Sequence, residues 1–237
     1  MLLVRSLAFQ VWMYGLMAVM GVVLSPAAAW SRTGAYWAID KYISAVFWGL
    51  KHLCNLTYEV RGEPPTGDAL VVSKHQSFLD ILILLKAMPA AKFVMKRSLV
   101  YAPILGFYAL RIGASPVTRG KGVASLGEMM EEVERRKDAD GQLVIFPQGT
   151  RLKPGVKAPY KYGAYAVYER GGGGAVPVAL NTGLFWPRLG VRRQPGVAVL
   201  EFLEPIPPGL DGRAFLAAME ERIETASERL LAEGPTS

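Results

Sequence analysis

Beyond Asn55 the chain alternates short apolar runs with longer segments of helical spacing, and this alternation limits the fold more than any other feature. Short apolar runs are typical of buried strands. They cover residues 57–60, 69–72, 93–95, 115–117, 143–146, 176–180 and 197–203. Helical spacing covers residues 77–88, 98–111, 120–136, 162–170 and 210–232. We therefore expect an α/β domain over residues 55–237, with a mixed, mostly parallel sheet flanked by helices.

The first 54 residues differ from this pattern, because they are apolar and contain no strand signal. Residues 7–24 have Gln10 as their only strongly polar side chain. The length of this segment is close to the ~20 residues that are needed to cross a bilayer. Residues 35–54 form an amphipathic pattern, with Trp37 and Trp48 suited to a membrane interface. We expect a membrane-associated helical hairpin over residues 1–54, joined near residues 26–32.

Several alternatives remain open for this hairpin. The first segment could span the bilayer, lie within one leaflet, or be a signal peptide cleaved after Ala27-Ala28-Ala29. The second helix could pack on the protein's own core, since amphipathicity does not identify the partner.

The composition favours anionic partners. Lys and Arg number 27 against 20 Asp and Glu, a net charge of +7, which suits phospholipid head groups, phosphorylated substrates or an acidic carrier. No recognisable nucleic-acid module is present, so we expect no nucleic-acid partner. Cys54 is the single cysteine, which excludes an intramolecular disulfide and fits a reducing compartment. We expect it to be a small buried hydrophobe.

The first candidate site lies where the predicted strand 69–72 passes into a helix. His75 is placed at the end of this strand, where α/β proteins often locate their chemistry. A neutral imidazole can accept a proton, and a carboxylate such as that of Asp80 can orient it. Alternatively, Asp80 only caps a helix that starts at Ser77. His52 has no carboxylate at a useful spacing and is predicted to be structural.

The second candidate site follows the strand 143–146. Pro147 ends the strand, and Gly149 permits backbone geometry that other residues resist. Thr150 and Arg151 then offer a hydroxyl and a guanidinium, whose planar fork suits a phosphate. By itself this heptapeptide would be an ordinary turn with a solvated arginine.

Together, the two clusters have a familiar pattern. His75-x4-Asp80, followed by Phe146-Pro147-Gln148-Gly149-Thr150-Arg151, resembles the glycerolipid acyltransferase family, and within it the 1-acyl-sn-glycerol-3-phosphate acyltransferases. Two further stretches agree over residues 55–205: Lys96-Arg97-Ser98-Leu99 with Pro103, Gly106, Gly113 and Arg119, and Val176-Pro177-Val178-Ala179-Leu180-Asn181. The resemblance implies acyl transfer to the sn-2 hydroxyl of lysophosphatidic acid, giving phosphatidic acid.

The resemblance also implies roles for residues and partners. His75 would be the general base and Asp80 its orienting carboxylate. A further set would bind the acceptor's phosphate: Arg151, Thr150, Gly149, Arg119, Lys96 and Lys161. Three residues would order loops: Pro147, Gln148 and Pro177. Acyl-CoA or acyl carrier protein (ACP) would supply the acyl group, with no cofactor and no metal, at the cytoplasmic side of a cell inner membrane.

Gln148 departs from the resembled pattern, which usually has Glu there. The amide keeps an acceptor oxygen but loses the charge. A negative charge beside a phosphate is unfavourable, so we expect Gln148→Glu to retain substantial turnover. Three other functions remain open: transfer to another lysolipid such as lyso-ornithine lipid, lipid binding without catalysis, and secreted hydrolysis. For secreted hydrolysis we would expect a Gly-x-Ser-x-Gly nucleophile elbow, which the sequence does not contain.

Overall fold

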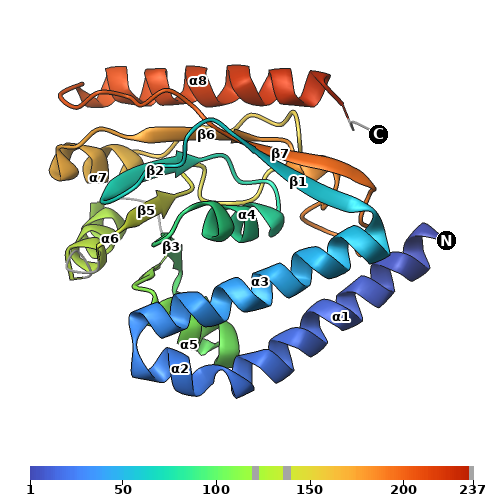
Figure 1. Ribbon diagram of the computed structural model, residues 1–237. Coiled ribbons are helices and arrows are strands. Elements are labelled where there is room, and N and C mark those ends of the chain that lie inside the picture. The colour runs from blue at the N-terminus through green and yellow to red at the C-terminus, as the bar shows by residue number, and fades with distance from the viewer. Residues whose placement is uncertain (119–122, 136–139, 235–237) are drawn as a thin grey trace.

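The structure is a computed structural model that describes residues 1–118, 123–135 and 140–234. In these residues a seven-stranded sheet has the spatial order β1-β7-β6-β2-β5-β3-β4. All neighbouring pairs are parallel except β6 and β7, which are antiparallel (Figure 1). The strands are β1 (Leu56–Arg61), β2 (Ala69–Ser73), β3 (Lys92–Lys96), β4 (Ser115–Val117), β5 (Gln142–Ile145), β6 (Val176–Leu180) and β7 (Gly196–Phe202). This confirms the predicted mixed, mostly parallel sheet, and every predicted strand end lies within one residue of the observed one.

The helices of the α/β domain follow the sequence pattern with four differences: those predicted to start at residues 77 and 210 start two residues later, one predicted helix is divided in two, and the short helix at 182–184 was not predicted. They are α4 (Leu79–Ala87), η1 (Arg97–Tyr101), α5 (Pro103–Arg111), α6 (Val123–Arg135), α7 (Gly163–Gly171), η2 (Thr182–Leu184) and α8 (Gly212–Ala232). The single helix predicted over 98–111 was wrong. Ala102 is extended, as a residue before proline prefers, and Pro103 starts a new helix. Parts of the helix predicted over 120–136 lie outside the described residues.

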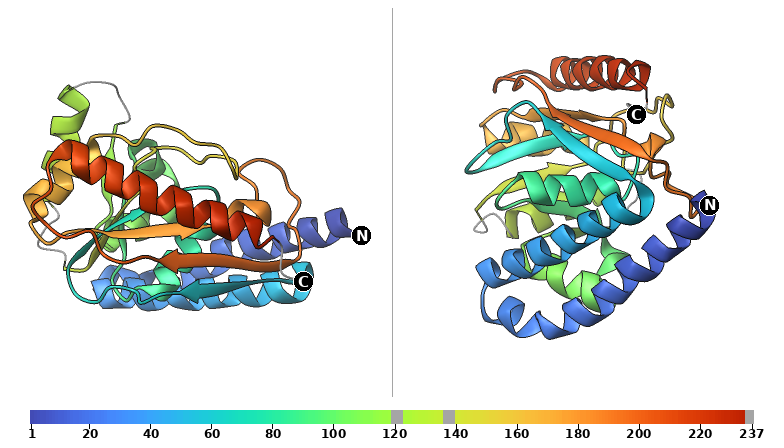
Figure 2. Two further views of the ribbon diagram at one scale, coloured as in Figure 1. Left: turned by 90° about the horizontal axis from the view of Figure 1, so that it is seen from above. Right: turned by 45° about the vertical axis from the view of Figure 1, so that its right-hand side comes forward.

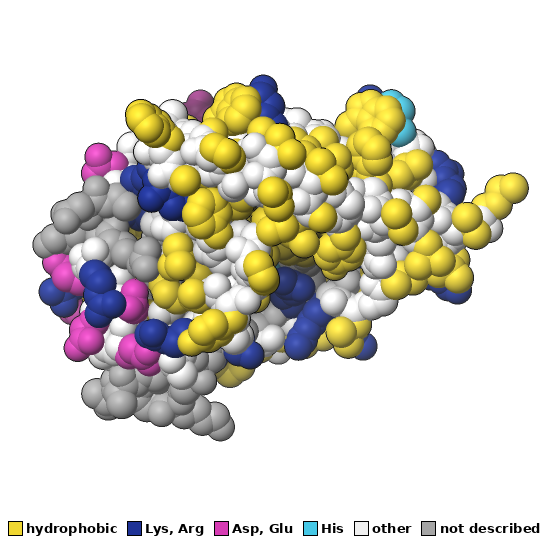
Figure 3. All heavy atoms as spheres, turned by 90° about the horizontal axis from the view of Figure 1, so that it is seen from below, with side chains coloured by type: hydrophobic (Ala, Val, Ile, Leu, Met, Phe, Trp, Pro, Cys, Tyr) yellow, Lys and Arg dark blue, Asp and Glu magenta, His cyan; other side chains and the backbone are white. Residues whose placement is uncertain are grey.

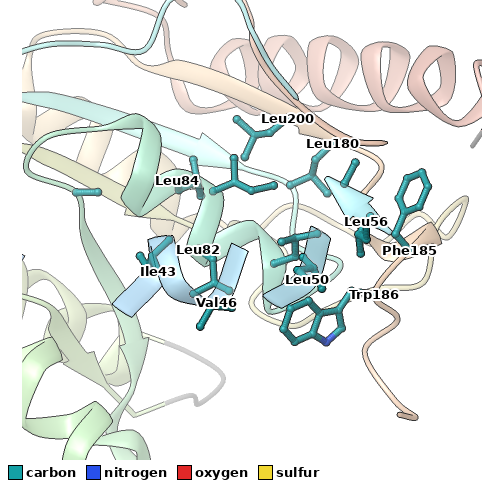
Figure 4. Packing of buried hydrophobic residues seen from close by; sticks show 14 of the residues in the cluster. Ile43, Val46, Leu50, Leu56, Leu82, Leu84, Leu180, Phe185, Trp186 and Leu200 are labelled. Atoms are coloured by element: carbon teal, nitrogen blue, oxygen red, sulfur yellow. The ribbon is translucent and has the colours of Figure 1, made fainter. Parts of the chain in front are cut away.

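Both faces of the sheet are buried. Adjacent residues of a strand point to opposite sides, so they enter two different cores. Val71 and Val144 belong to a core shared with α3 (Arg32–Cys54) and α4, which Figure 4 shows in close-up. Their neighbours Val72 and Ile145 belong to a second core, shared with α7 and α8. The sheet is therefore sandwiched between α8 and α7 on one side and α4 with the amino-terminal helices on the other (Figure 1).

The amino-terminal residues form the predicted hairpin, with α1 (Leu2–Val23) and α3 (Arg32–Cys54) side by side (Figures 1 and 2). A short helix, α2 (Ser25–Trp30), joins them near the expected place. Ser31 caps α3 by accepting a 2.9 Å hydrogen bond from the backbone N–H of Gly34. Asn55, with a left-handed φ of 52°, ends α3 and leads into β1.

The hairpin has one face on the protein and one face outside. Ile43, Val46 and Leu50 of α3 are fully buried in the core of the α/β domain, so one face of this helix does pack on the protein itself. In contrast, only 17% of the apolar stretch in α1 is buried. By length and composition α1 is the one described helix that is able to cross a membrane. The outer face of the hairpin therefore remains without a partner in the described chain.

The tight contact between α2 and α3 gives a stability test. A Cβ built on Gly34 would lie 2.1 Å from the carbonyl oxygen of Ala27, a backbone atom that cannot rotate away. We expect Gly34→Ala to lower the free energy of unfolding by about 1–3 kcal/mol. Gly15→Ala in α1 is the matched control, because a Cβ there meets nothing within 4 Å. The control should be neutral or stabilising. Chemical denaturation in detergent measures both; equal effects would contradict the helix contact.

Candidate active site

The Asp80 carboxylate organises the junction between β2 and α4. Its Oδ2 accepts a 2.8 Å hydrogen bond from Nδ1 of His75 and bonds of 2.7 and 2.9 Å from the backbone N–H groups of Gln76 and Ser77. Its Oδ1 accepts from the hydroxyl of Thr182. Asp80 is fully buried and His75 is 6% exposed. Because Nδ1 donates to this carboxylate, Nε2 is the nitrogen left to accept a proton.

Both roles considered for Asp80 are thus present together, but the helix starts later than predicted. Ser77 is not the N-cap residue, since α4 begins at Leu79. Its hydroxyl oxygen still accepts a 3.1 Å hydrogen bond from the backbone N–H of Leu79. Asp80 takes the N–H groups before the helix, so the same carboxylate fixes the imidazole and the start of α4.

Arg151 lies beside His75, as the pairing of their strands requires. Val72 of β2 and Ile145 of β5 are parallel partners, so the segments after both strands meet at the same edge of the sheet. Nε of Arg151 donates to Nε2 of His75 over 3.4 Å. The backbone N–H of Leu152 also donates to the carbonyl of His75, over 2.8 Å. The two sequence clusters therefore form one site.

The surroundings of this pair are partly aromatic. The ring of Phe146 stacks on His75 with centroids 3.8 Å apart. Arg151 is half-buried; burial lowers the pKa of its guanidinium, and the negative charge of Asp80 opposes that shift. Arginine keeps its charge at neutral pH even so, because its ordinary pKa lies far above neutral pH. The site thus presents a proton acceptor and a fixed positive charge.

The other predicted phosphate ligands are brought together only in part. Gly149 has a left-handed φ of 71°, and a Cβ there would lie 2.6 Å from Nζ of Lys161. Lys161 therefore reaches the same turn, beside the partly buried Thr150. Lys96 is exposed at the end of β3. Arg119 lies outside the described residues.

The three predicted loop-ordering residues lie in different settings. Pro147 accepts a 3.0 Å hydrogen bond from the backbone N–H of Lys161, which closes the loop after β5. Pro177 is not in a loop: it lies inside β6, where it is a register partner of Val72. Gln148 is buried and its amide donates to Oε1 of Glu224 over 3.4 Å.

Sequence reasoning missed Thr182 and Glu224. Thr182 follows β6, whose carboxyl end lies at the same edge as His75, so strand order could have indicated it. Glu224 lies 150 residues beyond Lys74, its ion-pair partner, and no local pattern links them. Its only sequence signal is an acid beside the apolar stripe of α8.

An apolar cavity of about 220 Å³ opens from Arg151 towards the hairpin. Side chains from α1, α3, α4 and α5 line it, among them Met20, Ile39, Ile81, Leu85, Ile104 and Tyr108. Figure 3 shows the molecule from this side, where hydrophobic side chains cover much of the surface and basic ones lie among them. The site thus joins a polar centre to a space suited to a hydrocarbon chain.

Comparison with known proteins agrees with this class of site. The family model described as Acyltransferase matches residues 57–181, more than half of the chain, and the chain therefore belongs to the acyltransferase family. Over 197 residues it is 24% identical to the 1-acyl-sn-glycerol-3-phosphate acyltransferase of Pseudomonas aeruginosa, covering 82% of this chain and 77% of that protein.

Two further relatives show how far the similarity extends. The chloroplastic 1-acyl-sn-glycerol-3-phosphate acyltransferase BAT2 of Brassica napus is 34% identical over 129 residues, which are 52% of this chain and 36% of that protein. The crystal structure of the 1-acyl-sn-glycerophosphate (LPA) acyltransferase PlsC from Thermotoga maritima has a TM-score of 0.79 and 22% identity, covering 98% of both chains. It shares the fold, including the amino-terminal helices.

The hydroxyl of Thr182 gives a test of the Asp80 carboxylate. Thr182→Val removes a donor to a fully buried carboxylate and keeps the side-chain shape. We expect kcat for acyl transfer to fall about tenfold or more, since a hydrogen bond to a charged group contributes about 1.5–3 kcal/mol. Thr182→Ser keeps the donor and should stay within about threefold of wild type. Steady-state kinetics of both variants test this role. Equal kcat values for Thr182→Val and Thr182→Ser would contradict it.

Proposed function

We propose that this acyltransferase moves a fatty acyl group from a thioester to the sn-2 hydroxyl of lysophosphatidic acid, giving phosphatidic acid. The observation that carries the proposal is the contact between His75 and Arg151, with Nε2 and Nε 3.4 Å apart. One group removes a proton from a hydroxyl, and the other binds a phosphate on the same small glycerol backbone. The names of the relatives in bacteria, plants and animals support the same reaction.

The chemistry assigned to His75 is general-base catalysis. Nε2 accepts the proton of the sn-2 hydroxyl as its oxygen forms a bond to the thioester carbonyl carbon. The carbon–sulfur bond then breaks, and the leaving thiolate takes the proton back from the imidazolium. Asp80 stabilises that positive form, and general-base help of this kind contributes about 10²–10⁴-fold.

The acceptor's phosphate is assigned to the turn after β5. Arg151 offers a planar fork for two phosphate oxygens, and Lys161 adds a second positive charge at Gly149. Thr150 contributes a hydroxyl at the same turn. Lys96 and Arg119 remain expected ligands, the first from the exposed end of β3 and the second from the residues that are not described.

The acyl donor is assigned to the apolar cavity between the hairpin and α4. Its lining is hydrocarbon except near Arg151, so a fatty chain can enter with the thioester left at His75. Either acyl-CoA or acyl-ACP fits this assignment as co-substrate. The reaction proposed needs no cofactor, and the described residues contain no group of three His, Cys, Asp or Glu able to hold a metal ion.

The lipid acceptor requires that the site lie at a membrane. The exposed Trp30, Trp37 and Trp48, at 91%, 48% and 54%, are suited to the interfacial zone, and the outer face of α1 is apolar. We assign this face of the hairpin to the cytoplasmic side of a cell inner membrane. The cavity, which the hairpin helps to line, would then receive chains from the bilayer.

The reaction is tested with purified protein, lysophosphatidic acid and a labelled acyl thioester, with the product identified by mass spectrometry. We expect phosphatidic acid from wild type and at least about 10²-fold slower turnover from His75→Ala, because the general base is gone. His52→Ala is the matched control: His52 is exposed, contacts Trp48 and should remain active. Turnover near wild type in His75→Ala would remove this residue from the mechanism.

The role of Arg151 is tested by changing the acceptor. Arg151→Ala should raise KM for lysophosphatidic acid about tenfold or more, since a charge-assisted pair with the phosphate is lost. On a monoacylglycerol, which lacks the phosphate, the same variant should match wild type. Arg213→Ala, an exposed arginine of α8, is the control. An equal loss on both acceptors would show that Arg151 does not bind the phosphate. If wild type turned over another lysolipid faster than lysophosphatidic acid, that lysolipid would be the acceptor instead.

A further inference from the structure

Four buried polar side chains form a group directly behind His75, which we call the Lys74–Glu224 cluster: Lys74, Gln148, Tyr160 and Glu224. Nζ of Lys74 lies 2.5 Å from Oε2 of Glu224. Oε1 of Glu224 accepts from the hydroxyl of Tyr160 at 2.8 Å and from the amide of Gln148 at 3.4 Å. The four residues are between 1% and 8% exposed. All of these contacts converge on one carboxylate.

The cluster is balanced with one positive and one negative charge. A buried ammonium without a counter-charge is strongly unfavourable, so Lys74 depends on Glu224. Tyr160 remains a hydroxyl donor, because burial and the Glu224 carboxylate both raise its pKa. Gln148 adds no charge, and its buried Oε1 has no hydrogen-bond partner among the described residues. A neutral amide at position 148 therefore matches the presence of Glu224.

Each member is attached to a part of the site. Lys74 precedes His75 in the chain, and Gln148 lies three residues before Arg151. Tyr160 lies at the end of the loop that Pro147 and Lys161 close. Glu224 comes from α8, on the opposite side of the sheet from the hairpin (Figure 1). One carboxylate thus connects α8 to both segments that carry the site.

We propose that Glu224 is a positioning residue for acyl transfer: by holding Lys74 and Gln148, its carboxylate fixes the spacing between His75 and Arg151. This rests on the proposed function, and in it Glu224 acts through Lys74 and Gln148. Lys74 and Gln148 contact the two oxygens of the same carboxylate, and the proposal extends to position 148: a glutamate there would replace Glu224 as the partner of the Lys74 ammonium. The cluster needs one carboxylate, and either position can supply it.

This arrangement changes the expectation for Gln148→Glu. Sequence alone indicates that position 148 tolerates the change. In the structure, however, the side chain at position 148 contacts Glu224, so the variant would put two carboxylates beside one ammonium, that of Lys74. The single variant should lose activity, because like charges in a buried place repel. Removing the charge of Glu224 at the same time should restore the balance.

The test compares Glu224→Gln, Gln148→Glu and the double variant in vesicles with lysophosphatidic acid and acyl-CoA. We expect each single change to lower kcat/KM at least about tenfold, with KM rising for the acceptor and staying within about twofold for the donor, whose cavity is elsewhere. The double variant should recover to within about threefold of wild type. A purely structural role would not give an acceptor-specific KM change or recovery by relocating the charge.

Glu228→Gln is the matched control, because it is the same change one turn along α8, in an exposed pair with Lys157. It should keep wild-type kinetics. The proposal is overturned if Glu224→Gln is as active as wild type, or if the folded double variant is no better than the singles. If wild type itself makes no phosphatidic acid, the proposed function fails instead. The melting temperatures of the same variants then test whether the negative charge can move from position 224 to position 148.

Tyr160→Phe covers the case in which Glu224→Gln does not fold. It removes one hydrogen bond to Glu224 and keeps the ion pair with Lys74. We expect kcat/KM to fall about threefold to tenfold with KM rising for the acceptor alone. Unchanged kinetics in this variant would overturn the proposal.

Discussion

The Asp80 carboxylate is the interaction on which the rest of the site depends. It has no contact with solvent and accepts from the imidazole of His75, two backbone N–H groups and the hydroxyl of Thr182. A buried charge is tolerated only when its lone pairs are satisfied, and here every donor comes from a segment that must be correctly folded. The same bonds that make the carboxylate stable therefore fix the tautomer of the His75 imidazole and the start of α4.

The order of the strands in the sheet then decides which side chains meet the His75 imidazole. The segments after β2, β5 and β6 emerge at one edge, because these three strands are parallel neighbours. They bring His75, Arg151 and Thr182 together, although the first two are 76 residues apart. Phe146 stacks on the imidazole at the same edge. The guanidinium and the imidazole are thus held together by strand pairing and by the hydrogen bond from the backbone N–H of Leu152 to the carbonyl of His75.

How much of this could be predicted from sequence follows from the range of each interaction. Strand ends were predictable within one residue, since they depend on local runs of apolar residues bounded by breakers. The break at Ala102 could also have been read from Pro103 alone. The meeting of His75 with Arg151 was expected from the paired motifs. Glu224 could not be found, because its partners are set by tertiary packing and an acid on a helix is usually a solvated residue.

The two faces of the hairpin explain why a lipid enzyme is built this way. The inner face of α3 packs on the sheet through Val46 and Leu50, so the hairpin is part of the fold and not a detachable anchor. Between this face and α4 lies the apolar cavity, with Arg151 at its polar end. In the proposed reaction, a lipid bound there would have its chain among the helices and its polar group at the sheet edge. The boundary between hydrocarbon and charge thus runs inside the protein, at Arg151, which contacts His75.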